Sequence, residues 1–187
     1  MVYQPFFEDF GPLNLGQTHC FCVELDKLVT HQDYKKAKIY HYCGENPKKK
    51  ANAAYLMGAY QIIALKKTAK DAWKPFAKES FPDFRDAMKG VSTYKCTVLH
   101  CLEGLEWAIK LGWYNSATFN VSEYQYYERV ENGDLNWVIP GKFIAFSTPV
   151  DTPQDFSFSP DYYVPIFKKF GVTMVIRLNT KEYDREV

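Results

Sequence analysis

The sequence predicts an α/β protein in which helices flank a central β-sheet, and three observations support this class. The stretch 38–65 begins with a β-favouring run at Ile39, breaks between Gly44 and Pro47, and continues as an apolar helix. The stretch 142–178 reads strand, helix, strand, which is typical of a βαβ crossover. Hydrophobic residues make up 47% of the 187 residues, which is ample for a buried core.

The helix in the first of these stretches is expected to be the centre of a domain. From Lys49 to Leu65 the chain is apolar on nearly every face, and Ala51, Ala54 and Gly58 share one face at helical spacing. A helix that is apolar all round is normally buried. Its small residues would let it pack closely against a sheet.

The loop before this helix has the pattern of a phosphate-binding loop, in which a strand ends and a helix N-terminus faces the anion. In cysteine phosphatases this loop reads His-Cys, five residues, Arg, with a Cys nucleophile and a bidentate Arg. Here Tyr42 follows His41 and Lys48 takes the Arg position, while a shift by one residue pairs Cys43 with Lys49. We interpret it as a phosphatase-like loop without its chemistry. The alternative is an ordinary strand-to-helix turn with lysines at its mouth.

The other helices are predicted from apolar periodicity together with capping and stop residues. Thr68 and Ser122 are the expected caps, and Gly112 and Gly171 are the expected stops. The predicted ranges are 13–29, 68–78, 93–111, 123–131 and 161–170.

Charge and cysteine content indicate which partners, compartment and metal sites to expect. Lys and Arg number 23 against 22 Asp and Glu, so net charge does not favour a nucleic-acid or membrane partner. No signal peptide is expected, because the opening segment has no basic or apolar run, and no apolar run of the sequence approaches the roughly 20 residues that span a bilayer. Five cysteines, an odd number, favour free thiols in a reducing, intracellular compartment. His19, Cys20 and Cys22 are interpreted as core residues rather than zinc ligands, and no metal or cofactor is expected.

The segment 123–134 is locally acidic, with four carboxylates against Arg129. Carboxylates beside tyrosines would attract a basic peptide into a groove. The alternative is a solvated helix face. The four acidic residues are Glu123, Glu128, Glu131 and Asp134.

Several long segments occur in the order seen in the Cdc-fourteen (cell division cycle fourteen) dual-specificity protein phosphatases, which the sequence resembles over essentially its whole length. They are FEDFGPLNL, HYCGENPKKKANAAYLMGAY, SEYQYYERVENGDLNWVIPGKFIAFSTP and FKKFGVTMVIRLNTKEYD. The resemblance implies two tandem phosphatase-like domains, the first inactive and used for recognition, the second carrying His-Cys-x5-Arg. It implies a degenerate recognition domain at 1–136, with a linker helix or loop at about 112–136, and the opening βαβ of a truncated phosphatase domain at 137–187. None of the five cysteines is followed six residues later by Arg, so the chain as given is expected to be catalytically inactive.

The resemblance also implies a substrate groove. In the family an acidic groove between the domains favours phosphoserine before proline, with a basic residue downstream. Asp9, Glu128 and Asp134 would fall at its acidic positions, and Phe7 and Phe10 would form the apolar wall near the substrate proline.

One residue departs from the family pattern of this groove. Gln125 stands where the family typically has Glu, which weakens the field of the groove and its preference for basic substrates.

Two functions remain open from the sequence. The first is the substrate-recognition part of a phosphatase that acts on phosphoserine or phosphothreonine before proline in cell-cycle proteins. The second is a non-catalytic pseudophosphatase scaffold in a larger cytoskeletal, centrosomal or ciliary assembly.

The expected partners are phosphoprotein or basic peptide segments, and a catalytic domain or protein that covers the open edge of the 172–178 strand. Neither nucleic acid nor membrane is expected. The family suggests nucleus, cytoplasm, centrosome or cilium without choosing among them.

Overall fold

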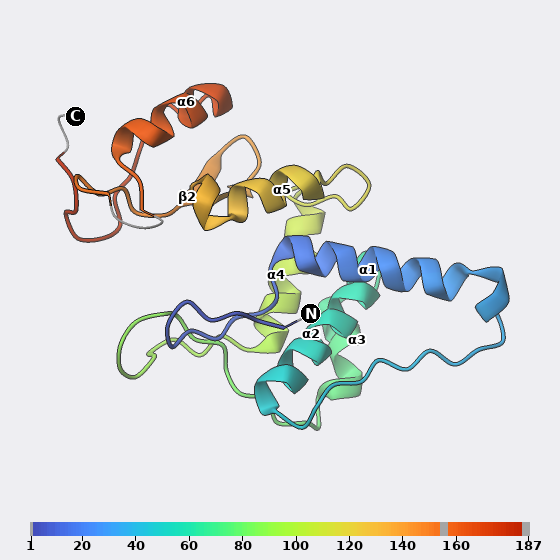
Figure 1. Ribbon diagram of the computed structural model, residues 1–187. Helices are drawn as coiled ribbons and strands as arrows, with labels where there is room; N and C mark the ends of the chain where they lie inside the picture. Colours follow the sequence, from blue (N-terminus) through green and yellow to red (C-terminus); the bar gives the residue numbers. More distant parts are fainter. Residues whose placement is uncertain (1, 154–156, 185–187) are drawn as a thin grey trace. The chain divides into compact units, whose positions relative to one another are not determined.

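The computed structural model describes residues 2–153 and 157–184 (Figure 1). The chain divides into two compact units, Met1–Phe119 and Asn120–Val187. The predicted boundary at residue 136 concerns the two domains of a complete phosphatase and stays a prediction.

Helix α2 is the centre of the first unit, and it contacts each of the other three α-helices there (Figure 1). The four helices are α1 (Leu15–Thr30), α2 (Pro47–Ile63), α3 (Ala69–Trp73) and α4 (Val98–Lys110), with 3₁₀ turns at Gln32–Tyr34 and Lys74–Phe76. The prediction of a buried central helix is therefore confirmed.

The close neighbour of α2 is another helix. A Cβ added to Gly58 would lie 2.6 Å from a methyl carbon of Leu102 on α4, and Leu102 is completely buried. Gly58 thus leaves room for the Leu102 side chain of α4 to pack directly against the backbone of α2. The expectation that these small residues face a sheet is wrong, because helix-on-helix packing covers this side of α2.

Helix ends in the first unit follow the capping signals. Thr68 accepts a hydrogen bond from the Asp71 amide at 3.1 Å, as predicted, and Thr97 forms a capping box with His100 at the start of α4. Gly112 has a φ of +72°, which fits its predicted role as the stop after α4.

The predicted strand at 39–42 is wrong. The chain from Lys36 to Glu45 has no regular structure, and the side chains of Tyr40 and Tyr42 are 78% and 89% exposed. A β-favouring run forms a strand only when a neighbouring strand satisfies its backbone groups. Among the described residues of this unit, β-type pairing is confined to two isolated bridges, Phe10 with Arg85 and Phe84 with Cys96.

The second unit is built on a β-hairpin. Strand β1 (Leu135–Ile139) pairs antiparallel with β2 (Phe143–Phe146), and Gly141 takes a φ of +71° in the turn. The helices are α5 (Val121–Glu128) and α6 (Pro160–Phe170), with a 3₁₀ turn at Val130–Asn132.

Its helix ends confirm one sequence signal and correct another. α6 ends at Gly171 as predicted, but the cap of α5 is Asn120 rather than Ser122, because the Asn120 side chain accepts from the Glu123 amide at 3.1 Å.

Aromatic side chains fill the core between the hairpin and α6. The ring of Phe146 lies 5.2 Å from that of Tyr163 and 5.0 Å from that of Phe167. The Tyr163 hydroxyl donates to the carbonyl of Gly133 at 3.0 Å, which ties α6 to the turn that precedes β1.

The predicted βαβ crossover is wrong. No strand forms at 172–178, where Met174 and Leu178 are 73% and 94% exposed, and β2 pairs with β1 in place of a parallel partner. The hairpin pairs the backbone N–H and C=O groups of β2 through a connection of only three residues, whereas a parallel pair requires a long crossover. Within 2–153 and 157–184 the fold mixes helices with one two-stranded antiparallel sheet, so the expected central sheet flanked by helices is wrong for this part of the chain.

His19 gives the first unit a predicted pH dependence. It is buried, its Nδ1 lies 2.8 Å from the Tyr114 hydroxyl, and burial lowers its pKa below the usual value of about 6.5. The unfolded chain therefore binds this proton first as the pH falls, so the free energy of unfolding should decrease below about pH 6.5. Denaturant unfolding between pH 8 and 5 measures this. His19→Gln should flatten the profile and His31→Gln, at an exposed histidine, should not; an unchanged slope in His19→Gln would contradict the assignment.

In the part of the chain that the structure describes, no helix is long and apolar enough to cross a membrane. The same residues hold no cluster of three His, Cys, Asp or Glu side chains suited to a metal ion.

Candidate functional site: a cavity at the start of helix α2

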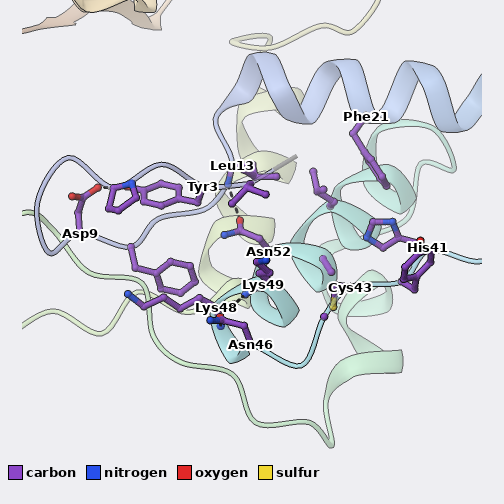
Figure 2. Close-up of a pocket in the computed structure, with 17 residues that line it drawn as sticks. Tyr3, Asp9, Leu13, Phe21, His41, Cys43, Asn46, Lys48, Lys49 and Asn52 are labelled. Carbon is purple, nitrogen blue, oxygen red and sulfur yellow. Dashed lines mark hydrogen bonds between the residues drawn. The ribbon is translucent and has the colours of Figure 1, made fainter.

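A cavity of about 460 Å³ lies in the first unit, beside the first turns of α2 (Figure 2). The N-terminal segment, Phe21 of α1 and the loop before α2 line it. All five residues of the predicted degenerate phosphate loop contribute to the lining, together with Asp9 and Phe10. These five are His41, Tyr42, Cys43, Lys48 and Lys49.

The N-terminus of α2 is capped by its own loop. The Asn46 side-chain oxygen accepts hydrogen bonds from the amides of Lys48 at 2.9 Å and Lys49 at 3.3 Å. Pro47 has no N–H, and the Lys50 amide donates to the Asn46 carbonyl at 3.0 Å. Each amide that a phosphate-binding helix would direct at its anion therefore already has an acceptor within the protein.

Two side chains of this loop region contact aromatic rings that line the cavity. The Lys48 ammonium lies 5.2 Å from the centre of the Phe10 ring, a cation–π contact. The His41 ring packs edge-on against Phe21 at 5.2 Å, on the far side of the cavity from Lys48 (Figure 2). Partial burial of its ring lowers the pKa of His41, although the residue as a whole stays exposed. Cys43 is exposed, and none of the arginines that the structure describes lines the cavity.

Asp9 organises the N-terminal segment. Its carboxylate accepts hydrogen bonds from the Phe7 amide at 2.7 Å and from the Tyr3 hydroxyl. The Phe7 amide and then the Tyr3 hydroxyl lower the pKa of Asp9, while burial and Asp9 raise the pKa of Tyr3 to about 12. Asp9 therefore carries its charge at neutral pH, with both oxygens engaged in folding this segment.

Asn52 attaches the same segment to α2. Its side chain is buried, accepts from the Leu13 amide at 2.8 Å and donates to the Gly11 carbonyl at 3.1 Å. The sequence did not predict Asn52 or the capping role of Asn46. An Asn-Pro pair before an apolar run is a helix-start signal that would have indicated Asn46. The partners of Asn52 are 39 and 41 residues away, so local sequence carries no signal for it.

The other two predicted acidic positions belong to the second unit. Glu128 is the last residue of α5 and is half-buried. Asp134 has a φ of +46°, and burial of its carboxyl raises its pKa, although the residue as a whole is exposed. A groove shared by Asp9, Glu128 and Asp134 stays a prediction.

The two predicted wall residues differ in position. Phe10 is 2% exposed and packs against Phe84 with ring centres 4.9 Å apart, so it belongs to the core as well as to the cavity lining. Phe7 is half exposed and is not among the lining residues. Their contact with a substrate proline stays a prediction.

Comparison with known proteins shows which family the chain belongs to. A family model described as the N-terminal half of dual specificity protein phosphatases matches residues 1–108, more than half of the chain. The chain belongs to the CDC14 family of dual-specificity phosphatases. It is 44% identical to human dual specificity protein phosphatase CDC14A over 191 residues, which cover 98% of this chain and 32% of the human protein.

Other CDC14 relatives show the same coverage. Identity is 39% to mouse dual specificity protein phosphatase CDC14B, over 98% of this chain and 39% of the mouse protein. It is 35% to the tyrosine-protein phosphatase CDC14 homolog of Schizosaccharomyces pombe, over 100% of this chain and 37% of the yeast protein. The chain thus spans about a third of the length of the curated relatives it matches.

We expect the 187-residue chain by itself to show no turnover of an aryl phosphate. The loop has Tyr42 in place of the nucleophile, Lys48 in place of the clamp, and amides bonded to Asn46. Hydrolysis of p-nitrophenyl phosphate by the purified chain should equal that of a mock preparation. Activity above the mock that disappears in Tyr42→Phe, with the fold retained, would show that the loop is catalytic.

Proposed function

We propose that this chain is the substrate-recognition half of a phosphatase that removes phosphate from serine or threonine before proline in cell-cycle proteins. Membership of the CDC14 family supports this proposal. The observation that carries the recognition role is the start of α2, where Tyr42 and Lys48 take the nucleophile and clamp positions and the amides of Lys48 and Lys49 are bonded to the Asn46 side chain. Catalysis then requires a separate domain with His-Cys-x5-Arg, and transfer proceeds through a cysteinyl phosphate.

Three carboxylates supply the charge with which this chain would recognise a basic peptide. Asp9 is held in its charged form by two hydrogen bonds, and Glu128 and Asp134 add two further carboxylates. Together they favour a peptide with a basic residue downstream of the phosphorylation site and disfavour acidic sequences. Gln125, exposed on α5, makes this preference weaker than an additional glutamate would. On this proposal the protein works inside the cell, in the nucleus, the cytoplasm, or at a centrosome or cilium.

Charge removal tests the acidic groove. Glu128→Gln with Asp134→Asn should weaken binding of a Ser-Pro-x-Lys peptide by about tenfold at low salt, because each surface charge pair contributes up to about 1 kcal/mol. Asparagine tolerates the left-handed backbone of position 134, so the fold is retained. Titration calorimetry or fluorescence anisotropy with the full chain measures the affinity.

The matched control for this experiment is Glu24→Gln with Glu79→Gln, which removes the same charge from two exposed positions of the first unit. Its affinity should stay within about twofold of the parent at the same salt, since these two residues are not part of the predicted groove and water weakens the attraction between charges that are not in contact. An equal loss in both double variants, or no loss in either, would remove Glu128 and Asp134 from the binding site.

A second candidate function is a non-catalytic scaffold, for which the segment 172–178 offers a binding surface. Its apolar side chains Met174, Ile176 and Leu178 are exposed, and its β-favouring backbone forms no strand in the described chain. A catalytic domain or another protein that adds a strand would cover such a segment.

A further inference from the structure

Two cysteines are placed next to each other at the start of α4. Thr97 caps this helix, so Cys96 occupies the position before the cap and Cys101 occupies the fourth helical position. Their sulfur atoms are 3.6 Å apart, and both residues are half-buried. Residues at these two positions commonly pack as a hydrophobic staple that fixes the direction of the entering chain.

The backbone holds Cys96 from its other side. The Cys96 carbonyl accepts a hydrogen bond from the Phe84 amide at 2.7 Å. Phe84 is buried and packs against Phe10, so this pairing connects Cys96 to the core of the first unit. The two thiols therefore lie together because both of their backbone segments are fixed, one by a β-bridge and the other by α4.

We propose that Cys96 and Cys101 form a redox modification site, in which a hydroperoxide converts this non-covalent staple into a disulfide. A disulfide requires the sulfur atoms to approach to about 2.05 Å, which is about 1.5 Å closer than they lie now. Rotation of the two side chains can supply much of this approach. The resulting bond would join the end of the 81–97 segment covalently to the second turn of α4.

The chemistry balances with one hydroperoxide. The Cys96 thiol loses its proton and the thiolate attacks the peroxide oxygen, so the O–O bond breaks and Cys96 becomes a sulfenic acid; the departing hydroxide or alkoxide takes up the thiol's proton and leaves as water or an alcohol. The Cys101 sulfur then attacks the Cys96 sulfur, its proton joins the departing hydroxide as water, and the S–S bond forms. Burial, together with neighbouring Cys96, raises the pKa of Cys101 to about 12, which assigns the first step to Cys96. Glutathione or thioredoxin reverses the reaction in a reducing compartment.

The other cysteines lack this arrangement. Cys20 and Cys22 are two residues apart on α1, so their side chains leave the helix in different directions. Cys43 is exposed on the loop before α2. These three thiols therefore serve as internal controls for selective oxidation of the pair.

Peptide mass spectrometry of the full chain tests the proposal. The chain is treated with hydrogen peroxide at low protein concentration, blocked with N-ethylmaleimide and digested with trypsin. Cleavage after Lys95 and Lys110 places both cysteines in one peptide, CTVLHCLEGLEWAIK. We expect this peptide to be two hydrogens lighter and free of maleimide, and to gain two maleimide groups if dithiothreitol precedes blocking.

Two outcomes would overturn the proposal. One is a peptide that keeps two maleimide groups under conditions that oxidise the exposed Cys43. The other is oxidation of Cys96 to a sulfinic acid without loss of the Cys101 thiol.

Single replacements extend the test to stability. Cys96→Val and Cys101→Val keep the apolar staple and remove the bond. Peroxide should raise the melting temperature of the parent by about 4–8 °C and leave both variants unchanged. An equal rise in a variant would assign the effect to another thiol.

Discussion

Replacing Leu102 with alanine is expected to lower the free energy of unfolding by about 2–5 kcal/mol. Leu102 is completely buried between α4 and α2, and its methyl groups occupy the space left open at Gly58. Truncation removes their contacts and leaves a cavity that two packed helices cannot easily close. Denaturant unfolding gives the magnitude, and native-state hydrogen exchange of α2 amides shows that the loss lies in the first unit.

Gly58→Ala, made in the parent chain and in the Leu102→Ala variant, tests whether Gly58 and Leu102 contact each other. In the parent, the added Cβ would lie 2.6 and 2.8 Å from the two Leu102 methyl carbons, so we expect a net loss of about 1–2 kcal/mol. In Leu102→Ala the same change should stabilise by about 1 kcal/mol, because alanine favours a helix over glycine and the obstacle is gone. The same effect in both backgrounds would contradict the close packing of α2 on α4.

Asn52→Ala should have the second largest effect, a loss of about 2–4 kcal/mol. The change leaves the Leu13 amide and the Gly11 carbonyl without their side-chain partner, and each unpaired buried polar group costs about 1–3 kcal/mol. Since these bonds attach the N-terminal segment to α2, amides of residues 3–13 should exchange faster, and chymotrypsin should cut sooner after the phenylalanines of this segment.

Asn46→Ala is the matched control on the same helix. It removes a cap at an exposed helix start and should cost only about 1 kcal/mol, with the N-terminal segment as protected as in the parent. If Asn52→Ala is no more harmful than Asn46→Ala, the N-terminal segment is not held by Asn52.

The helices were predictable because their signals are local. The apolar face of α4, its glycine stop and the glycine after α6 all lie within the elements they define. The buried α2 could be predicted from composition alone, but its neighbour could not. Whether Gly58 faces a sheet or another helix depends on Leu102, which is 44 residues away in the sequence.

The strands were harder to predict because a strand depends on its partner. The runs at 39–42 and 172–178 favour β-structure by residue type, yet neither is paired in the described chain. The predicted strand at 142–147 is confirmed as β2, but its partner β1 and the hairpin pairing were missed, although Pro140 and Gly141 between two β-favouring runs are a turn signal.

The residues around the cavity also divide into those that a local motif predicts and those whose contacts depend on the fold. The degenerate loop was expected from its motif, and the structure gathers all five of its residues around one cavity. The bonds that occupy the amides of Lys48 and Lys49 come from a neighbour that the motif does not include, Asn46. The attachment of the N-terminal segment by Asn52 depends on contacts that only the fold creates.

The most direct test of the proposed function is the mass and peptide content of the endogenous protein. Immunoprecipitation with an antibody against residues 1–150, followed by mass spectrometry of the purified band, measures both. The recognition-half proposal predicts a polypeptide much heavier than 21.8 kDa that yields a His-Cys-x5-Arg peptide. An endogenous protein of 21.8 kDa that ends at Val187 would contradict it and favour the scaffold.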